Sequence, residues 1–213
     1  YIFRIHNLSY VIKDSLVCIN YINRNLNMLN LNLGSGSKRI KDYINVDKYN
    51  TFNPDIVHDL EQFPYPFKDN SVDNILLSHV LEHIGQHPDT FNLIMKELYR
   101  ICKNQTLISI TVPHPRHDDF LSDPTHVRPI TILGLQLYDK ELNEKWQKQK
   151  AANSPLALIH NVDFRIKHVR YDLEDKYNNM LKDQKIDKQT LEDMMDKYNN
   201  VIKQIFIQLE AIK

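Results

Sequence analysis

Apolar and polar residues alternate along several short stretches of this chain, and a period of two is the pattern of a β-strand. The first clear stretch is 28–33, where leucines alternate with Asn30 and Asn32. Further stretches of strand length are 43–47, 55–59, 71–78, 107–112, 163–171 and 201–212. The last of these alternates well enough for a strand, although a helix also accommodates it. The pattern therefore predicts a sheet of about seven strands.

Helical periods separate the later strands. Residues 91–103 place their apolar side chains roughly on one side, and Thr90 is the expected N-cap. Residues 131–150 and 188–199 also indicate helices. Only residues 37–42 separate the glycine turn after the first strand from the second strand, which is too short for a full crossover helix, so we expect the first helix to be reduced to about one turn. This alternation predicts an α/β fold with a mostly parallel, doubly wound sheet and helices on both faces.

Three segments fall outside this alternation. Residues 1–27 show no clean period, and we expect them to form an N-terminal extension on the edge of a domain that spans 28–213. Residues 113–130 are a long polar loop rich in His, Asp, Arg and Pro, and such loops in compact domains are usually functional. Residues 173–200 are rich in Lys, Asp and Asn and predict a solvated helical insertion before the last strand.

Composition narrows the class of protein. Lys and Arg number 27 and so do Asp and Glu, so bulk charge does not indicate a nucleic-acid partner. No apolar run approaches the roughly 20 residues of a membrane span. Cys18 and Cys102 are far apart and make no disulfide framework, which favours reduced thiols and a cytoplasmic location. The chain starts at Tyr1 without a signal-peptide pattern, so we expect it to begin inside a longer one.

A glycine turn follows the first strand. The chain has only 4 glycines, and Gly34 and Gly36 lie here on either side of Ser35. Because glycine has no Cβ, such a turn lets the backbone approach a ligand closely. An ordinary strand-to-helix turn would also explain the two glycines, since this spacing alone is a weak signal.

Polar residues stand where the next strands end. Asp47 ends the second strand, Asp59 the third, and Ser78 and His79 the fourth. Ligands of open α/β sheets bind beyond the carboxyl ends of the strands, and a carboxylate there suits the two hydroxyls of a ribose. An isolated aspartate is more often a turn or cap residue. The occurrence of the whole set in order favours a nucleotide-type cofactor site.

Through these motifs, the run from Leu29 to Val112 resembles the class I S-adenosylmethionine-dependent methyltransferases, and most closely a subgroup with a shortened first helix. The matching segments are the glycine motif at 31–36, the acidic second strand at 43–47, the adenine-side segment at 55–60 and the fourth strand with its exit at 71–83. The resemblance implies a Rossmann-like, mostly parallel sheet of seven strands whose last strand is antiparallel.

The resemblance also implies roles for individual residues. Gly34 and Gly36 would face the methionine part of S-adenosylmethionine, and Asp47 would bind the ribose. Asp59 and Leu60 would face the adenine, whereas Ser78 and His79 would lie near the sulfonium. The complete implied cofactor set is Leu33, Gly34, Ser35, Gly36, Asp47, Asp59, Leu60, Ser78 and His79. Two departures are the absence of a third glycine and the Lys103–Gln105 turn, where relatives carry a Pro-Gly-Gly type of turn.

Candidates for catalysis lie in the 113–130 loop. The cofactor carries the reactive methyl group, so the protein needs to align the acceptor and remove a proton. His117 and His126 suit a general base because imidazole titrates near neutrality. Arg128 suits a carboxylate or phosphate of the acceptor, as does Arg116. We therefore expect the catalytic residues to be His117, His126, Arg128 and Asp119, and the segment 123–128 resembles one found in this subgroup.

Two other interpretations of the loop stay open. A metal ion could be held by His114, His117, Asp118, Asp119 and His126, although their spacing matches no known zinc pattern, and we predict no metal site. The loop could also be a polar lid whose charges pair with one another. His83 follows His79 by four residues, but Gly85 and Pro88 interrupt a helix there, so His83 is expected to be structural.

The sequence thus predicts a methyltransferase that acts on oxygen or nitrogen of a small-molecule or saccharide acceptor. We expect no nucleic-acid or membrane partner, while 1–27 or 173–200 could bind another protein. The alternative is a catalytically silent methyltransferase-like fold that serves as a binding or structural module.

Overall fold

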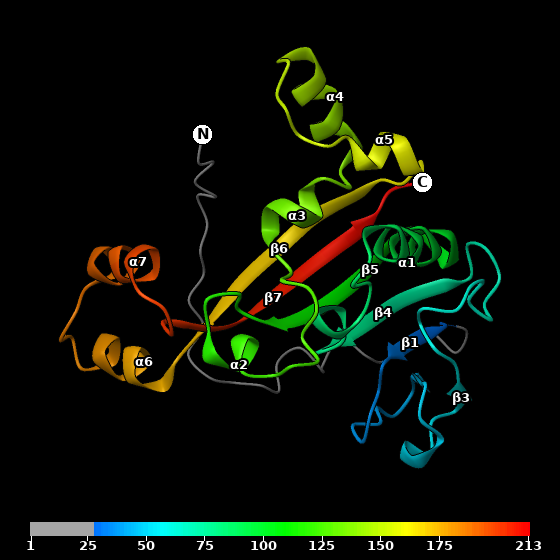
Figure 1. Ribbon diagram of the computed structural model, residues 1–213. Coiled ribbons are helices and arrows are strands. Elements are labelled where there is room, and N and C mark those ends of the chain that lie inside the picture. Colours follow the sequence, from blue (N-terminus) through cyan, green and yellow to red (C-terminus); the bar gives the residue numbers. More distant parts are fainter. Residues whose placement is uncertain (1–27) are drawn as a thin grey trace.

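The computed structural model describes residues 28–213, so the expected extension 1–27 lies outside the described residues. Its centre is a sheet of seven strands in the order β3-β2-β1-β4-β5-β7-β6 (Figure 1). The strands are Asn30–Leu33 (β1), Ile44–Asp47 (β2), Ile56–Val57 (β3), Val72–Ser78 (β4), Cys102–Pro113 (β5), Phe164–Leu173 (β6) and Ile202–Ala211 (β7). Only β7 runs antiparallel to its neighbours, which confirms the predicted fold class.

The α-helices of the described residues all come after β4 in the chain. They are Pro88–Ile101 (α1), Asp118–Leu121 (α2), Ile132–Gln136 (α3), Lys140–Lys148 (α4), Leu156–His160 (α5), Asp175–Lys182 (α6) and Lys188–Lys197 (α7). Two short 3-10 turns are Asn50–Phe52 (η1) and Leu81–His83 (η2). None of the helices described in 28–213 is long and apolar enough to cross a bilayer.

Helix α1 starts earlier than the pattern predicts. His87 is its N-cap, and the ring Nδ1 accepts a hydrogen bond from the Asp89 backbone N–H at 3.3 Å. Pro88 occupies the first helical position, where its missing N–H costs nothing. The expectation of Thr90 as the cap is therefore wrong. The apolar side of α1 enters the same buried cluster as strands β4 and β5, which fixes the helix against the sheet.

The predicted helix over 131–150 is two helices. Thr131 caps α3 by accepting from the Gly134 backbone N–H, and Asp139 caps α4 by accepting from Leu142. The link between them contains Tyr138, a buried ring whose hydroxyl donates to the Asn92 side chain at 2.6 Å. The caps and this buried tyrosine outweigh the continuous helical pattern.

The insertion 173–200 contains α6 and α7. The two helices lie side by side at one end of β6 and β7 (Figure 1). They share a separate apolar cluster made of Leu173, Leu191, Met195, Val201 and Ile202. This small core ties the insertion to the ends of both strands.

The link from β1 to β2 contains no helix, and two buried asparagines hold it instead. Asn32 and Asn45 are 3% and 2% exposed, and the Asn32 amide donates to Asn45 Oδ1 at 2.9 Å. Asn45 also binds the backbone N–H and carbonyl of Ile40, at 2.8 and 3.2 Å. Asp55 accepts from the backbone and side chain of Asn45, and these bonds, with the Arg39 guanidinium, lower the pKa of Asp55 to about 2.

Replacing Asn45 tests this network. In Asn45→Ala, the Ile40 N–H loses its side-chain partner, and the Asn32 amide keeps only the Lys38 carbonyl. The free energy of unfolding should therefore fall by about 2–4 kcal/mol. Urea denaturation followed by circular dichroism measures the change. The matched control is Asn50→Ala on exposed η1, which should stay within about 0.5 kcal/mol of the unchanged protein. Equal losses in the two variants would contradict the role of the network.

Candidate functional site

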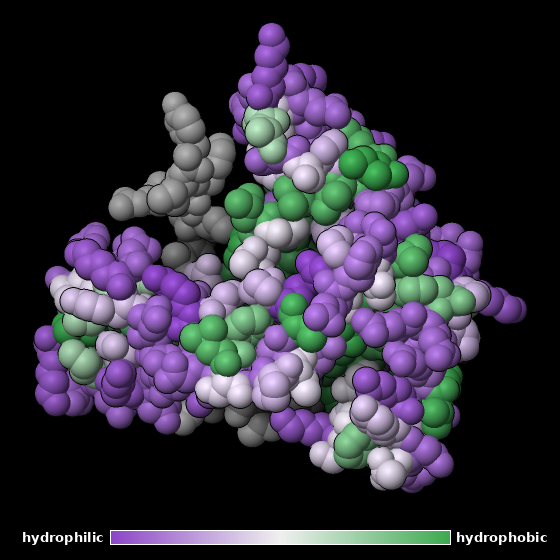
Figure 2. Space-filling model, viewed as in Figure 1, coloured by the Kyte–Doolittle hydropathy of each residue, from purple (hydrophilic) through white to green (hydrophobic). Residues whose placement is uncertain are grey.

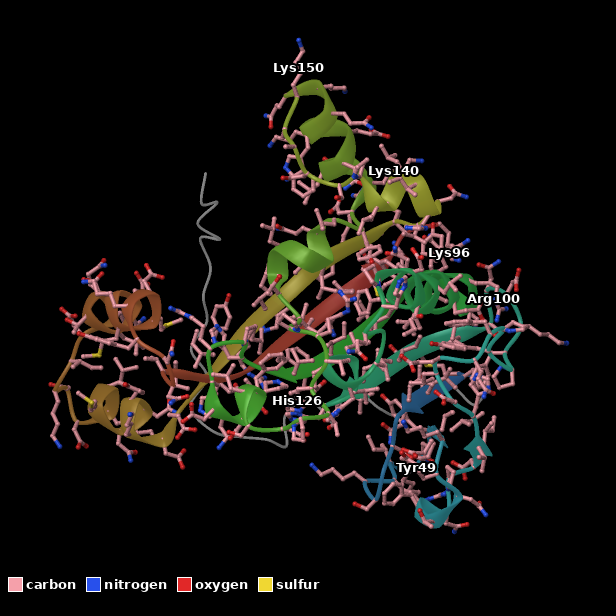
Figure 3. All side chains as sticks on the ribbon, viewed as in Figure 1. Tyr49, Lys96, Arg100, His126, Lys140 and Lys150 are labelled. Atoms are coloured by element: carbon pink, nitrogen blue, oxygen red, sulfur yellow. The ribbon has the colours of Figure 1, made fainter. Side chains whose placement is uncertain are left out.

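The polar residues predicted to form a site lie at one edge of the sheet. Strands β3, β2, β1 and β4 are direct neighbours and run in the same direction, so their carboxyl ends meet. The glycine turn follows β1 after the buried Leu33, Asp47 ends β2 and Ser78 ends β4. Figure 3 labels Tyr49, which lies just beyond β2, and His126, which lies in the loop around α2. These two residues mark the β2 side and the loop side of this edge. The structure therefore brings the predicted cofactor residues together.

The two glycines of the turn have different reasons to be glycine. Gly34 has φ of 67°, and a Cβ there would lie 2.6 Å from the Val80 side chain in the segment after β4. Gly36 has φ of 49°, and a Cβ there would meet no described atom within 4 Å. Only Gly36 therefore leaves open space for a ligand, whereas Gly34 is required by packing. Between them, the buried Ser35 Oγ has no hydrogen-bond partner among the described residues.

Asp47 joins the glycine turn to the end of β2. Its carboxylate is largely buried, with the residue 8% exposed. Oδ2 accepts the Gly36 backbone N–H at 2.8 Å, and Oδ1 accepts the Tyr49 backbone N–H at 2.9 Å. A carboxylate has about four acceptor sites, so each oxygen can still accept a hydroxyl of a ligand.

A hollow of about 460 Å³ opens beside the ends of β2 and β3. Its lining residues are Lys48, Tyr49, Val57, His58, Asp59 and Gln62. The volume falls in the range of small-molecule and cofactor sites. Figure 2 shows hydrophilic and apolar residues mixed at the lower right, where the segment around β3 lies. Leu60 is buried beside the hollow, and its carbonyl accepts the Tyr65 hydroxyl at 2.9 Å.

His79 occupies a strained position at the exit of β4. Its φ is 56°, in the left-handed region that is uncommon for residues other than glycine, and its backbone N–H donates to the Thr111 carbonyl at 2.8 Å. Such strain is often retained at functional sites. The ring is 43% exposed, and its Nδ1 lies 3.3 Å from Oε1 of the buried Glu82. The sequence pattern predicts His79 at this position but not Glu82, although a carboxylate directly after the apolar pair 80–81 is a usable signal.

His117 has partners for both ring nitrogens. Nδ1 accepts the Asp119 backbone N–H at 3.0 Å, which makes His117 the N-cap of α2. Nε2 lies 3.1 Å from Glu174 Oε1, at the start of the insertion. Asp119 itself is half-exposed, with its carboxylate 3.8 Å from Lys203 Nζ. A base role for His117 would require one of these contacts to break.

The two loop arginines hold backbone carbonyls. Arg128 donates from Nε to the Gly85 carbonyl at 2.9 Å and lies 4.4 Å from the centre of the Phe91 ring. Arg116 donates to the carbonyls of Asp196 and Met195 in α7. These contacts tie the 113–130 loop to the η2 segment on one side and to the insertion on the other.

His126 lies in the same loop as His117 but has different neighbours. Its ring stacks on Phe120, and Nδ1 lies 2.9 Å from the Phe120 carbonyl. The ring of His83 is its neighbour on the other side, with 4.5 Å between ring centres. The structure thus holds His117 toward Glu174 and His126 toward the η2 turn.

Comparisons with known proteins agree with this fold. A family model described as a methyltransferase domain matches residues 23–110. A SAM-dependent methyltransferase from Archaeoglobus fulgidus has 15% identity and a TM-score of 0.56, covering 86% of each chain. One from Methanosarcina mazei has 13% identity and a TM-score of 0.54, covering 94% of this chain and 99% of the other.

Phosphoethanolamine N-methyltransferase 2 from Haemonchus contortus, solved with S-adenosyl-L-methionine, has 12% identity and a TM-score of 0.52. The match covers 91% of this chain and 50% of that one. No curated protein matches the sequence. At these identities the solved structures share the fold with this chain.

Substitution of the two glycines separates packing from ligand space. Gly34→Ala meets the Val80 side chain as well as an unfavourable φ, so its free energy of unfolding should fall by about 2–4 kcal/mol. Gly36→Ala meets only the unfavourable φ and should lose about 1–2 kcal/mol. Thermal and urea unfolding of both variants measure this. A Gly36→Ala loss as large as that of Gly34→Ala would contradict the open space at Gly36.

The pH dependence of stability reports on His114, which follows β5. Burial, then the charge of Arg116 and the neighbouring His117, lower the pKa of His114 to about 4. A histidine with a pKa depressed on folding binds fewer protons when folded than when unfolded. Its contribution to stability is therefore present above about pH 6.5 and is lost as the pH falls toward 4.

Titration of the ring proton signals by NMR should give this low pKa directly. Urea unfolding of His114→Asn should then depend less on pH between 6.5 and 4 than unfolding of the unchanged protein. His168→Asn, a change at an exposed histidine of β6, is the control. A His114 midpoint near 6.5 would refute this assignment.

Proposed function

We propose that this chain, which carries a methyltransferase domain on the class I methyltransferase fold, transfers a methyl group from S-adenosylmethionine to oxygen or nitrogen of a small-molecule or saccharide acceptor. The resemblance drawn from the sequence is confirmed by the family match over 23–110 and by the strand order. The observation that carries the proposal is the junction of Gly36 with Asp47. It places open space and a buried carboxylate side by side at the carboxyl edge of the sheet.

The residues at this edge fit S-adenosylmethionine. The Ser35 hydroxyl, which has no hydrogen-bond partner in the described part of the chain, and the open space at Gly36 are suited to the polar methionine end. The remaining acceptor sites of Asp47 would bind the ribose hydroxyls, and the hollow that includes Tyr49 and Asp59 would take the adenine. When bound, the cofactor supplies an electrophilic methyl group on its sulfonium. Ser78 and His79, beyond β4, would border the sulfonium.

The acceptor would lie between the exit of β4 and the 113–130 loop. We propose that His117 and Arg128 position this loop, because both hold it through hydrogen bonds in the described structure. Asp119 lies in the same loop and is half-exposed. In His126, Nδ1 is the nitrogen bonded to a carbonyl, which leaves Nε2 as the nitrogen with a lone pair. His126 is therefore the member of the predicted set that is able to accept a proton or bind a ligand group.

Cofactor binding tests the proposal first. Isothermal titration calorimetry with S-adenosylhomocysteine should show one site per chain. Asp47→Ala should weaken binding about 10–100-fold, because charge-assisted hydrogen bonds to the ribose are worth about 1.5–3 kcal/mol. Circular dichroism checks that the variant is folded, since Asp47 also holds the glycine turn. The control Asp193→Ala, at an exposed position of α7, should bind normally. Absence of binding by the unchanged protein would favour the silent binding or structural module instead.

The acceptor class is then tested by the product. Protein that binds S-adenosylhomocysteine is incubated with S-adenosylmethionine and a panel of hydroxylated, amino and saccharide compounds. Formation of S-adenosylhomocysteine and a mass gain of one methyl group on one compound identify the acceptor and the atom. Exclusive turnover on a nucleic-acid panel would overturn the proposed acceptor class and leave the transferase activity in place.

A further inference from the structure

Beside the proposed cofactor site, three side chains converge from two distant parts of the sequence. Glu82 and His83 belong to η2, and His126 comes from the 113–130 loop. One potential ligand atom from each of the three lies within 4.8 Å of the others. Two backbone hydrogen bonds fix the loop here, because the Glu82 carbonyl accepts from Val127 at 2.8 Å and from Arg128 at 3.2 Å.

The Glu82 carboxylate lacks the partners that a buried charge needs. Glu82 is 0% exposed, and neither of its side-chain oxygens has a hydrogen-bond partner among residues 28–213. His79 Nδ1 comes within 3.3 Å of Oε1, but the pair lacks hydrogen-bond geometry. Burying an ionised carboxylate without a hydrogen-bonded partner is costly, and proteins usually pair such a group with a cation or a metal ion.

Hydrogen bonds prepare both histidines as ligands. Thr125 Oγ1 donates to Asp123 at 2.6 Å and is then free to accept from His83 Nδ1 at 2.9 Å. His126 Nδ1 donates to the Phe120 carbonyl at 2.9 Å. Both rings therefore carry their proton on Nδ1 and present the lone pair of Nε2. Metal-binding histidines are held in this way by a hydrogen bond from the other ring nitrogen.

We propose that Glu82, His83 and His126 form a binding site for one divalent transition-metal ion. Two imidazoles and one carboxylate are a zinc ligand set that leaves a position open, and the same set also suits ferrous iron. A second carboxylate, Asp123, lies 3.8 Å from His126 Nε2 and adds negative charge. The site differs from the metal set considered from the sequence, of which it includes only His126.

The role of the ion rests on the proposed function, whereas its binding does not. The site adjoins His79, beside the expected position of the sulfonium. Its open coordination position would hold an acceptor oxygen, and the positive charge would make that oxygen lose its proton to solvent more readily. The oxygen lone pair would then bond to the methyl carbon as the bond from that carbon to the sulfonium breaks. In this arrangement His126 acts as a ligand rather than as the base.

Zinc binding to the whole chain tests the site. Protein stripped with a chelator is titrated with Zn²⁺ in competition with a chromophoric chelator, and one tight site per chain is expected. His126→Ala and Glu82→Gln should each weaken that site by at least about 100-fold. The matched control is His168→Ala, which removes an exposed histidine of β6 and should leave the affinity unchanged. No saturable site, or equal affinity in all variants, would overturn the proposal.

Cobalt provides a second measurement that does not depend on the buried variants folding. Co²⁺ bound by the unchanged protein should give visible absorption bands, and these should disappear in His83→Ala, a change at a half-buried position. Bands that persist in this variant would refute the ligand set. Calorimetry with S-adenosylhomocysteine on the same samples separates the two proposals. Cofactor binding without a metal site refutes only the metal, and a metal site without cofactor binding refutes only methyl transfer.

Discussion

The hydrogen bond between the buried amides of Asn32 and Asn45 is the interaction on which this molecule depends. In most doubly wound sheets a helix covers the link between the first two strands, and its packing fixes where the first strand ends. Here residues 37–43 form no helix, so the Asn45 amide binds the link directly through Ile40. A helix supplies many apolar contacts, whereas this link is held by a few buried polar bonds that must all be satisfied.

The absence of that helix shapes the candidate cofactor site. A long helix after the glycine turn would direct its positive end toward a ligand. In this chain the Asp47 carboxylate holds the turn by accepting the Gly36 backbone N–H. The Ser35 hydroxyl has no hydrogen-bond partner among the described residues and is able to bind a ligand. The site therefore relies on individual polar groups at the ends of strands. Gly34 has no space for a larger side chain, because the Val80 side chain occupies the position where a Cβ would lie.

The acceptor side is organised by long-range contacts. Arg128 and the Glu82 carbonyl hold one end of the 113–130 loop to η2, while Arg116 and His117 hold the other end to the insertion and its first residues. Polar residues that look like catalytic groups in the sequence thus also serve as anchors. These contacts do not involve the side chain of Glu82, a buried carboxylate that lies beside the imidazole rings of His83 and His126.

The sequence by itself determined the strands, their α/β class, the short first crossover and the positions of Gly36, Asp47 and His79 at strand ends. These features follow from local periodicity, and parallel strands place their ends at one edge whatever the details of packing. The tertiary structure decided which of the possible local caps start α1 at Pro88 and α4 after Asp139, and it alone decided the partners of His117 and His126. Each of these depends on groups distant in the sequence or on competing caps, and periodicity carries no information about which distant polar groups meet.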